Sequence, residues 1–298
     1  MSQTKQQIEA LLAGAGLAPE RRLGQHFLID GNLMRLLVEE AGLTDGQTVL
    51  EVGAGTGSLT GLLAEAVGPG GRVVAVEIDH RLAAIAGEQL RGYANVRLLC
   101  WDVLARKSAL EPAVVEALRE ASQQGAGEIV LVANLPYQAS APLMMNLLGG
   151  SPTCTAMTVT VQAELAERMT AAAGTKAYGT LGILLQATGE VRRLRTVGPT
   201  AFWPMPNVYS AIISWRRDEG KCRQIAEWSS LKRVVEMLLQ HRRKTIQSCL
   251  HLAAAGPEAG ALLQRAGIDG AARGETLAPE QFVALANLWA GRPATSRP

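Results

Sequence analysis

Cysteine and histidine are scarce in this chain of 298 residues, and their scarcity excludes several kinds of site. The four cysteines lie far apart and form no CxxC pair, which fits neither a zinc site nor a disulfide framework. The four histidines likewise form no HExxH-type group. We therefore expect no bound metal, and we expect the cysteines to be buried thiols in a reducing compartment.

Long apolar runs are also missing. No segment approaches the roughly 20 apolar residues that a membrane-spanning helix needs. One apolar patch, residues 10–18, lies near the N-terminus, but Glu9 precedes it and Arg21 and Arg22 follow it, which argues against a secretory signal. With 48% hydrophobic and 19% charged residues, the composition predicts a packed core and no long disorder. We expect a cytoplasmic protein that does not contact membranes.

The charges that are present are spread unevenly. Residues 1–187 hold 13 Lys and Arg against 18 Asp and Glu, whereas residues 188–248 hold 12 against 5. A basic segment beside a neutral-to-acidic body is typical of a protein that faces a polyanion, although a solvated surface could carry the same charges.

Short β-branched strands alternate with helical segments from about residue 48 onward. The expected strands are 48–52, 72–77, 96–100, the run from residue 129 into Asn134, and 155–161. This rhythm predicts an α/β fold: a doubly wound, mostly parallel sheet with helices on both faces. Ligands of such sheets bind beyond the carboxyl ends of the strands.

The pattern changes after Gly189. Two more strand-like segments, 191–197 and 208–215, flank a loop at 201–207 in which two prolines argue against a helix. From Ser229 the pattern is helical, with breaks at Gly256-Pro257 and at 267–270. We expect a boundary near Lys221, with the α/β ligand-binding domain at 1–220 and a small all-helical domain at 221–298.

A glycine-rich turn follows the first expected strand. Glycines at 53, 55 and 57 permit a tight turn and a close approach of a ligand to the backbone. The dinucleotide fingerprint GxGxxG would need glycine at position 58, which is Ser58 here. The spacing favours S-adenosylmethionine over a nicotinamide dinucleotide, although a glycine turn alone is weak evidence.

Carboxylates close the next two expected strands. Glu77 ends the second strand, where it can accept both ribose hydroxyls of an adenosyl ligand, and Asp102 follows the third, where it can accept from the adenine amine. Either acid alone could be a solvated surface residue. Both together, above the glycine turn, favour an adenosyl ligand.

The fourth expected strand runs into the stretch VANLPYQAS at 132–140. An exocyclic adenine amine is a poor nucleophile, and acceptors at its two hydrogens would stabilise the positive charge that develops during methyl transfer. The Asn134 side-chain oxygen can be one acceptor and the Pro136 carbonyl the other, while the Tyr137 ring can stack on a flipped base. The alternative is an ordinary turn, in which Asn and Pro are common.

With these motifs assembled, the chain resembles the small-subunit ribosomal RNA adenine dimethyltransferase family over nearly its whole length. NLPY at 134–137 is typical of amine-directed methyltransferases. Four further motifs narrow the resemblance to this family: GQHFL at 24–28, KAYG at 176–179, the FxPxPxV pattern from Phe202 to Val208, and HRRKT at 241–245, which is similar to an arginine-rich helix start.

The resemblance implies a class I methyltransferase with a Rossmann-like sheet and S-adenosylmethionine as cofactor, released as S-adenosylhomocysteine. It implies that Tyr137 and Phe202 sandwich the target base and that Arg242, Arg243 and Lys244, at the start of a helix, contact RNA. The residues implied to border the cofactor are His26, Leu28, Gly53, Gly55, Glu77, Asp102 and Asn134.

The activity implied is dimethylation of N6 on two adjacent adenosines, in a stem-loop near the 3′ end of small-subunit (16S) rRNA. The substrate would be the rRNA within the 30S subunit or its precursor, and the enzyme a monomer. Two departures fall near the site. Gln138 and Ala139 follow NLPY where the family often has Asn-Ile, and Asn207 and Tyr209 flank the loop valine where Lys and Asp are usual.

Three alternatives remain. A large-subunit rRNA adenine methyltransferase of the antibiotic-resistance type would share the catalytic motifs, but HRRKT and the long C-terminal region favour the small subunit. A non-catalytic RNA-binding assembly factor would keep the fold, but the intact Asn134, Pro136 and Tyr137 argue for chemistry. A nicotinamide oxidoreductase is disfavoured by Ser58.

Overall fold

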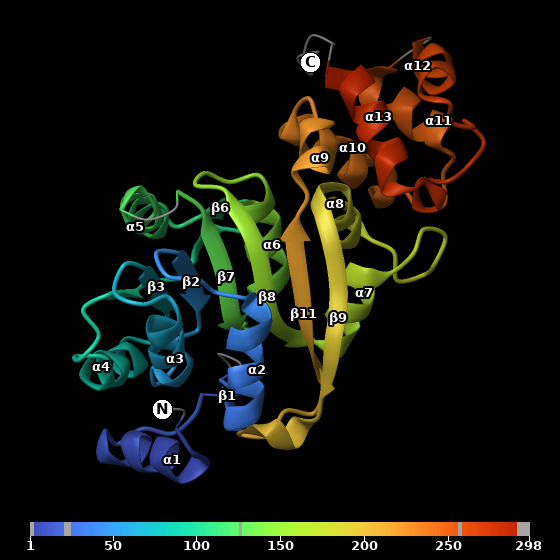
Figure 1. Ribbon diagram of the computed structural model, residues 1–298. Helices are drawn as coiled ribbons and strands as arrows, with labels where there is room; N and C mark the ends of the chain where they lie inside the picture. The colour runs from blue at the N-terminus through green and yellow to red at the C-terminus, as the bar shows by residue number, and fades with distance from the viewer. Residues whose placement is uncertain (1–2, 21–24, 125–126, 256–257, 291–298) are drawn as a thin grey trace. The chain divides into compact units, whose positions relative to one another are not determined.

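A seven-stranded sheet organises the first of two compact units in the computed structural model, which describes residues 3–20, 25–124, 127–255 and 258–290. The strand order is β4-β3-β2-β7-β8-β11-β9 (Figure 1). The strands are β2 (Thr48–Val52), β3 (Arg72–Glu77), β4 (Val96–Cys100), β7 (Ile129–Asn134), β8 (Cys154–Gln162), β9 (Gly189–Val197) and β11 (Ser210–Arg217).

Five neighbouring strands of this sheet run parallel, as the sequence predicts. The parallel pairs are β4 with β3, β3 with β2, β2 with β7, and β7 with β8, whereas β11 runs antiparallel to β8. Strands β3 and then β4 follow β2 along the chain and lie on one side of it, whereas β7 lies on the other side of β2 and is followed outward by β8. The carboxyl ends of β2 and β7 therefore form the switch point at which ligands of doubly wound sheets bind.

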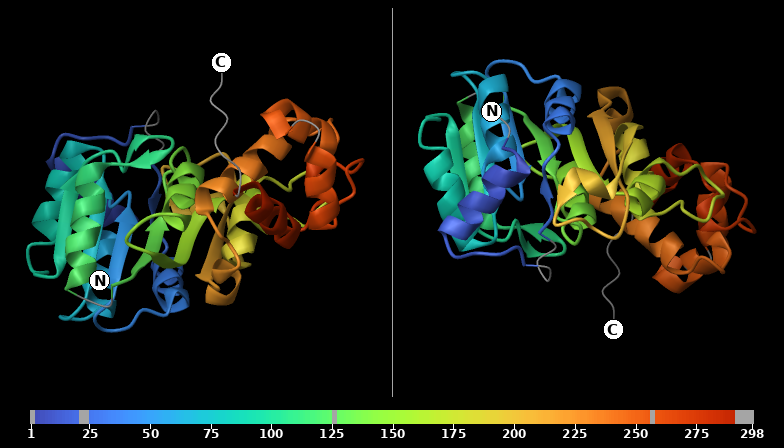
Figure 2. Two further views of the ribbon diagram at one scale, coloured as in Figure 1. Left: turned by 90° about the horizontal axis from the view of Figure 1, so that it is seen from above. Right: turned by 90° about the horizontal axis from the view of Figure 1, so that it is seen from below.

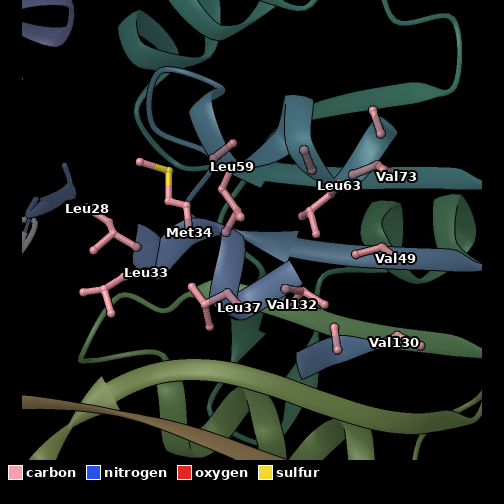
Figure 3. Close-up of a cluster of buried hydrophobic side chains, with 14 of the residues drawn as sticks. Leu28, Leu33, Met34, Leu37, Val49, Leu59, Leu63, Val73, Val130 and Val132 are labelled. Atoms are coloured by element: carbon pink, nitrogen blue, oxygen red, sulfur yellow. The ribbon is translucent and has the colours of Figure 1, made fainter. Parts of the chain in front are cut away.

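The sheet is buried on both faces by helices. All five residues of β2 are buried, as expected of a central parallel strand, although Glu51 interrupts its apolar sequence. Helices α2 (Gly31–Ala41) and α3 (Ser58–Ala66) cover one face, where leucines of both helices pack on valines of β2 and β7 (Figure 3). Helix α6 (Ser140–Leu148) lies behind the strands in Figure 1 and packs on β8.

Further helices and small strands complete the first unit. They are α1 (Lys5–Gly14), α4 (His80–Gln89), α5 (Pro112–Gln123), the short hairpin of β5 (Leu104–Arg106) and β6 (Ala109–Leu110), and the 3₁₀ turn η2 (Pro199–Ala201). Two views from above and below show helices on either side of the sheet (Figure 2).

A two-residue ladder joins distant parts of the first unit. Strand β1 (Phe27–Leu28) pairs antiparallel with β10 (Phe202–Trp203), and Phe27 lies opposite Trp203 while Leu28 lies opposite Phe202. The expected irregular loop at 201–207 therefore contains a short strand. This ladder brings the GQHFL segment beside the proline-rich loop.

The second unit comprises 167–191 and 217–298, and its described residues are mainly helical outside the β9 and β11 ends. In α10, Leu231, Val234, Val235 and Leu238 recur at helical spacing and are fully buried. Helix α10 packs against α8 and α13. The helices are α7 (Ala163–Thr170, whose first residues belong to the first unit), α8 (Thr180–Thr188), α9 (Glu219–Arg223), α10 (Trp228–Gln240), α11 (Ile246–Leu250), the π-helical turn η3 (His251–Ala255), α12 (Ala259–Ala266), the 3₁₀ turn η5 (Gly274–Thr276) and α13 (Pro279–Ala290).

Several expectations can be compared with this arrangement. The second compact unit consists of two segments, 167–191 and the residues from Arg217 onward. The sequence predicts a single boundary near Lys221, which places 167–191 in the first domain. The functional division at 1–220 and 221–298 stays a prediction. The expected helix break at 267–270 is confirmed, since α12 ends before Gly267, whereas Gly256-Pro257 lies outside the described residues.

The expectation of four buried thiols is only half right. Cys154 and Cys249 are buried, but Cys100 is exposed at the end of an outer strand and Cys222 is half-buried. In the described part of the chain, every helix is too short or too polar to cross a membrane.

Candidate active site

A cavity of about 230 Å³ lies at the carboxyl ends of β2, β3 and β7, within the first unit. Ten residues that the sequence singled out line this one cavity. Their roles remain predictions, but the fold brings them together. They are His26, Leu28, Gly53, Gly55, Glu77, Asp102, Asn134, Pro136, Tyr137 and Phe202.

The glycine turn after β2 forms one wall of the cavity. Gly53 and Gly55 have positive φ angles, +83° and +58°, which L side chains rarely adopt. A Cβ at Gly53 would lie 3.1 Å from Pro136 Cγ, and one at Gly55 would lie 3.2 Å from the Phe27 ring. The turn therefore requires glycine both for its backbone and for its close packing.

Glu77 lies at the end of β3 and is bonded to this turn. Its carboxylate accepts from Gly55 N at 2.8 Å and from Asp79 N at 3.0 Å. Burial raises the pKa of Glu77, against the opposing effect of these two donors. The carboxyl group is thus fixed at the cavity wall, as a ribose-binding group would need to be.

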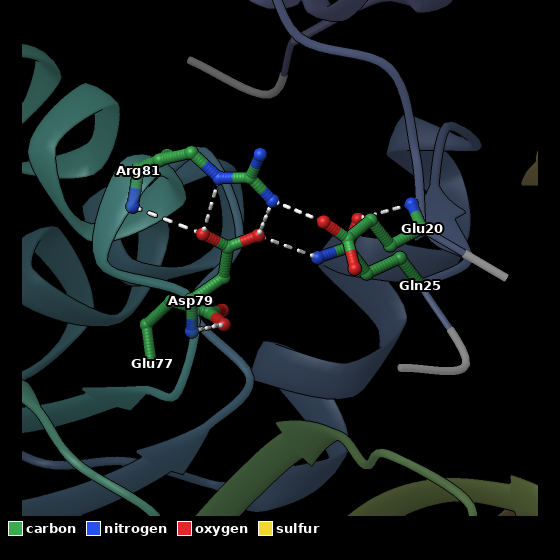
Figure 4. A network of polar contacts seen from close by, with 5 residues as sticks. All are labelled: Glu20, Gln25, Glu77, Asp79 and Arg81. Carbon is green, nitrogen blue, oxygen red and sulfur yellow. Dashed lines mark hydrogen bonds and ion pairs between the residues drawn. The ribbon is translucent and has the colours of Figure 1, made fainter. Parts of the chain in front are cut away.

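Asp79 anchors a polar network beside Glu77 (Figure 4). It caps α4 by accepting from Arg81 N at 3.0 Å, pairs with the Arg81 guanidinium, and accepts from Gln25 Nε2 at 3.1 Å. Burial alone would raise the pKa of Asp79, but the donors of Arg81 and Gln25 outweigh it and lower the value to about 2. Arg81 also pairs with Glu20. The network fastens the segment around Gln25 to the turn that follows Glu77.

Glu51 is a cavity residue that the sequence analysis did not select. It lies within β2, is buried, lines the cavity, and its Oε2 has no hydrogen-bond partner among the described residues. Burial, with a smaller contribution from the nearby Glu77 carboxylate, raises the pKa of Glu51 to about 8. Its signal in the sequence is a lone acid inside an otherwise apolar strand, TVLEV.

His26 is held on two sides. Its Nδ1 donates to the Pro204 carbonyl at 2.6 Å, and its own carbonyl accepts from Asn134 Nδ2 at 3.1 Å. Because a carbonyl oxygen only accepts, Nδ1 carries the proton of this hydrogen bond. Together with the Gln25 bond to Asp79, these contacts hold Gln25 and His26 at the cavity. The preceding residues of the motif, 22–24, lie outside the described residues.

The two carbonyls that follow Asn134 differ in their bonding. The Pro136 carbonyl already accepts from Ala139 N, Ser140 N and Ser140 Oγ, at 3.1, 3.2 and 2.9 Å. In contrast, the Leu135 carbonyl has no donor among the described residues, and Leu135 lines the cavity. The expected role of the Pro136 carbonyl therefore stays a prediction, but its three hydrogen bonds at the turn that leads into α6 make it a poorer acceptor for a further donor. The available carbonyl is that of Leu135.

Two aromatic rings border the same region. The Tyr137 ring lies 5.9 Å from the His26 ring, with the planes inclined by 31°, and its hydroxyl is 3.1 Å from Ser210 Oγ. Phe202 is buried in the core of the unit but also lines the cavity.

Asp102 is exposed at the rim of the cavity. Its carboxylate accepts from Leu104 N at 2.9 Å, which fixes one of its two oxygens.

The basic triplet lies elsewhere, in the second unit, and the expected helix start is wrong. Residues 241–244 form the turn between α10 and α11, and α11 begins at Ile246 with Thr245 as its cap. The reason is local: the Thr245 hydroxyl accepts from Ser248 N, so the helix starts after the triplet. Arg242 donates to the carbonyls of Lys176 and Tyr178, at 3.2 and 3.0 Å. The side chains of Arg243 and Lys244 are exposed and make no hydrogen bond or ion pair with any described residue.

Known proteins resemble this chain over most of its length. The sequence profile of the family described as ribosomal RNA adenine dimethylase matches residues 18–290. A protein of Geobacillus thermodenitrificans named ribosomal RNA small subunit methyltransferase A is 36% identical, over 95% of each chain. A protein of the same name from Mycobacterium bovis is also 36% identical, over 94% of this chain and 86% of its own.

Solved structures share the fold of this chain. A dimethyladenosine transferase from Plasmodium falciparum shares the fold, with a TM-score of 0.68 and 21% identity over 87% of this chain and 96% of its own. The 23S rRNA methyltransferase ErmE has a TM-score of 0.59 and 27% identity over 88% and 98%. The match across nearly the whole sequence, together with the cavity at the switch point, leads to one conclusion: the chain belongs to the ribosomal RNA adenine dimethylase family.

Proposed function

We propose that this chain transfers methyl groups from S-adenosylmethionine to the N6 amines of two adjacent adenosines, in a stem-loop near the 3′ end of small-subunit rRNA. The observation that carries the proposal is a pair of neighbouring acceptors at the cavity. The side-chain oxygen of Asn134 and the main-chain oxygen of Leu135 have no donor among the described residues. An adenine amine has two hydrogens, one for each acceptor.

The cavity has the features that an adenosyl cofactor needs. Gly53 and Gly55 leave room that a Cβ would fill, Glu77 offers a fixed carboxylate for ribose hydroxyls, and the rim carries Asp102. Glu51 adds a buried carboxylate oxygen without a partner, which suits a cationic group of the ligand. S-adenosylmethionine, when bound, supplies an electrophilic methyl group on a sulfonium.

The chain's own residues would orient the amine rather than deprotonate it beforehand. Asn134 donates through Nδ2 to the His26 carbonyl, so the amide oxygen is the atom left to accept. Acceptance by Asn134 and Leu135 would stabilise the positive charge that grows on N6 as the new bond forms. The amine proton becomes acidic once the nitrogen is methylated and leaves to water. The Tyr137 ring would stack on the flipped base.

Incubation of the protein with S-adenosylmethionine and small-subunit particles, followed by mass spectrometry of the rRNA, tests the proposal. The expected result is dimethyladenosine at two adjacent positions. The similarity to ErmE makes large-subunit rRNA the natural comparison substrate, and modification of that RNA alone would overturn the small-subunit assignment. RNA binding without any methyl transfer would make the chain an assembly factor.

Naked rRNA, assembled subunits and subunit precursors should be compared in the same assay, since we propose that the substrate is rRNA within the subunit or its precursor. We further propose that the protein acts in the cytoplasm as a monomer, that it uses no metal, and that residues 221–298 form an RNA-binding domain. Light scattering during gel filtration tests the monomer, and retained activity in EDTA tests the absence of a metal requirement.

A further inference from the structure

The segment Pro204–Tyr209, between β10 and β11, exposes apolar side chains beside the cavity. Met205 is 63% exposed, Tyr209 60% and Val208 41%. These are half of the six large hydrophobic side chains that are exposed in the described part of the chain. Three such residues within one short loop form a concentration that solvation alone does not explain.

The loop is fastened at both ends to cavity residues. At its start, the Pro204 carbonyl accepts from His26 Nδ1 at 2.6 Å. At its end, the Tyr209 carbonyl accepts from Ala163 N at 2.9 Å, and the next residue, Ser210, bonds the Tyr137 hydroxyl at 3.1 Å. The exposed side chains therefore belong to a loop whose two ends are fixed by hydrogen bonds, in part from His26 and Tyr137 of the cavity.

The position of the loop indicates what would cover it. His26 and Tyr137 line the cavity in which the target base would stack, and both bond to the loop or to the residue after it. A polynucleotide that inserts one base there must carry its neighbouring nucleotides across the adjoining surface. Aromatic and apolar side chains stack on unpaired bases of any sequence, because every base has a flat face.

We propose that Tyr209, supported by Met205 and Val208, stacks on the base of a nucleotide next to the target adenosine and so positions single-stranded RNA at the site. The inference deepens the proposed function and rests on it, since it takes the cavity ligand to be an adenosine in RNA. It assigns this loop a substrate-positioning role that does not involve the reacting atoms.

Tyr209→Ala tests the proposal with an RNA hairpin that carries the target adenosines in its loop. Stacking of one base on one aromatic ring is worth enough that its loss should raise the KM and the Kd for this RNA about tenfold. The kcat at saturating RNA should stay within about twofold, because the contact is equal in the ground and transition states. Tyr209→Phe, which keeps a ring, should behave as the wild type.

An abasic nucleotide on either side of the target adenosine identifies the partner of Tyr209. In the wild type, an abasic nucleotide on the contacted side should weaken binding about as much as Tyr209→Ala does. In Tyr209→Ala the same RNA should cause no further loss. The proposal would be overturned if, for an abasic nucleotide on either side, the loss of RNA affinity simply multiplied with the loss caused by Tyr209→Ala. It would also be overturned if Tyr209→Ala bound RNA as tightly as the wild type, and the loop would then be a candidate site for a protein partner.

Glu116→Ala is the control, since Glu116 lies exposed on α5 in the first unit, pairs with Arg119 and does not line the cavity. It should leave the KM and kcat for RNA unchanged. Direct RNA binding in the presence of S-adenosylhomocysteine separates the two hypotheses. Binding that depends on Tyr209 without any methyl transfer would contradict the proposed function alone, whereas transfer that is indifferent to Tyr209 would contradict this inference alone.

Discussion

The side-chain amide of Asn134 donates to the main-chain carbonyl of His26 at 3.1 Å, although 108 residues separate the two. The bond joins the NLPY motif at the end of β7 to the GQHFL motif near the N-terminus. It also decides which atom of Asn134 is available, because an amide whose nitrogen is engaged presents its oxygen to a ligand. Two motifs that look independent in the sequence thus form one acceptor site.

Asn134→Ala should lower the rate of methyl transfer by about a hundredfold or more, because one oriented acceptor for the amine is lost. The affinity for S-adenosylhomocysteine should change little. Single-turnover transfer to rRNA and calorimetry with the product measure the two effects separately. A variant with wild-type turnover would remove Asn134 from the mechanism, and a variant that fails to bind the product would make it a cofactor residue instead.

Glu77→Ala should have the opposite profile, with weaker cofactor binding as the main defect. Hydrogen bonds to a charged carboxylate contribute roughly 1.5–3 kcal/mol each, so the Kd for S-adenosylhomocysteine should rise at least about tenfold. Glu88→Ala is a suitable control, since Glu88 lies exposed on α4 and pairs with Arg91. Equal affinity in both variants would mean that the ribose binds elsewhere, and a melting temperature for each variant would identify a folding defect.

Glu51→Gln should change how stability depends on pH in the cofactor-free protein. The pKa of Glu51 is raised from 4.5 to about 8 in the folded chain, so the folded state binds more protons than the unfolded state between those values. The free energy of unfolding attributable to this group therefore falls as the pH rises from about 4.5 to 8, and then levels off. The glutamine carries no charge and removes this fall.

Melting temperatures of the wild type and Glu51→Gln at pH 5, 6.5 and 8 measure this difference. The variant should gain stability relative to the wild type at each step upward. A constant difference across the series would contradict a buried, neutral Glu51. In Glu51→Gln the cofactor should also bind more weakly at pH 8, where the carboxylate would otherwise face a cationic group of the ligand.

Local sequence patterns were enough to predict much of the fold. The five parallel strands are short, β-branched and bounded by turn residues, so their positions follow from local chemistry. The same holds for the residues at the strand ends: because parallel strands share one carboxyl edge, Gly53, Glu77 and Asn134 had to lie near one another.

The features that the sequence did not predict depend on contacts between distant residues. The ladder of β1 with β10 joins two-residue strands that have no pattern of their own. Whether the carbonyl of Leu135 or Pro136 is free depends on where α6 begins, which the motif NLPY does not specify. Glu51 was overlooked because its isolation is visible only once β2 is known to be central and buried.

The basic residues of the turn at 241–244 allow a structural role to be tested separately from RNA binding, because their contacts differ. Arg242 bonds the carbonyls of Lys176 and Tyr178, in the KAYG segment. Tyr178 is itself fully buried, and its hydroxyl donates to the Leu277 carbonyl at 3.1 Å. The HRRKT and KAYG motifs therefore contact each other, and we expect Arg242 to stabilise the fold, whereas its predicted contact with RNA stays untested.

Arg242→Ala should lower the melting temperature by about 2–4 °C, the shift that a loss of about 1 kcal/mol produces in a chain of this size class. The double variant Arg243→Ala/Lys244→Ala should melt as the wild type, because neither side chain bonds a described residue. Its affinity for rRNA should fall, and the slope of log K against log salt should flatten by about 0.7–0.9 for each lost phosphate contact. Affinity for S-adenosylhomocysteine should stay unchanged in both proteins. An unaltered salt slope in the double variant would exclude these two residues from the RNA interface, and a lower melting temperature there would assign them to the fold.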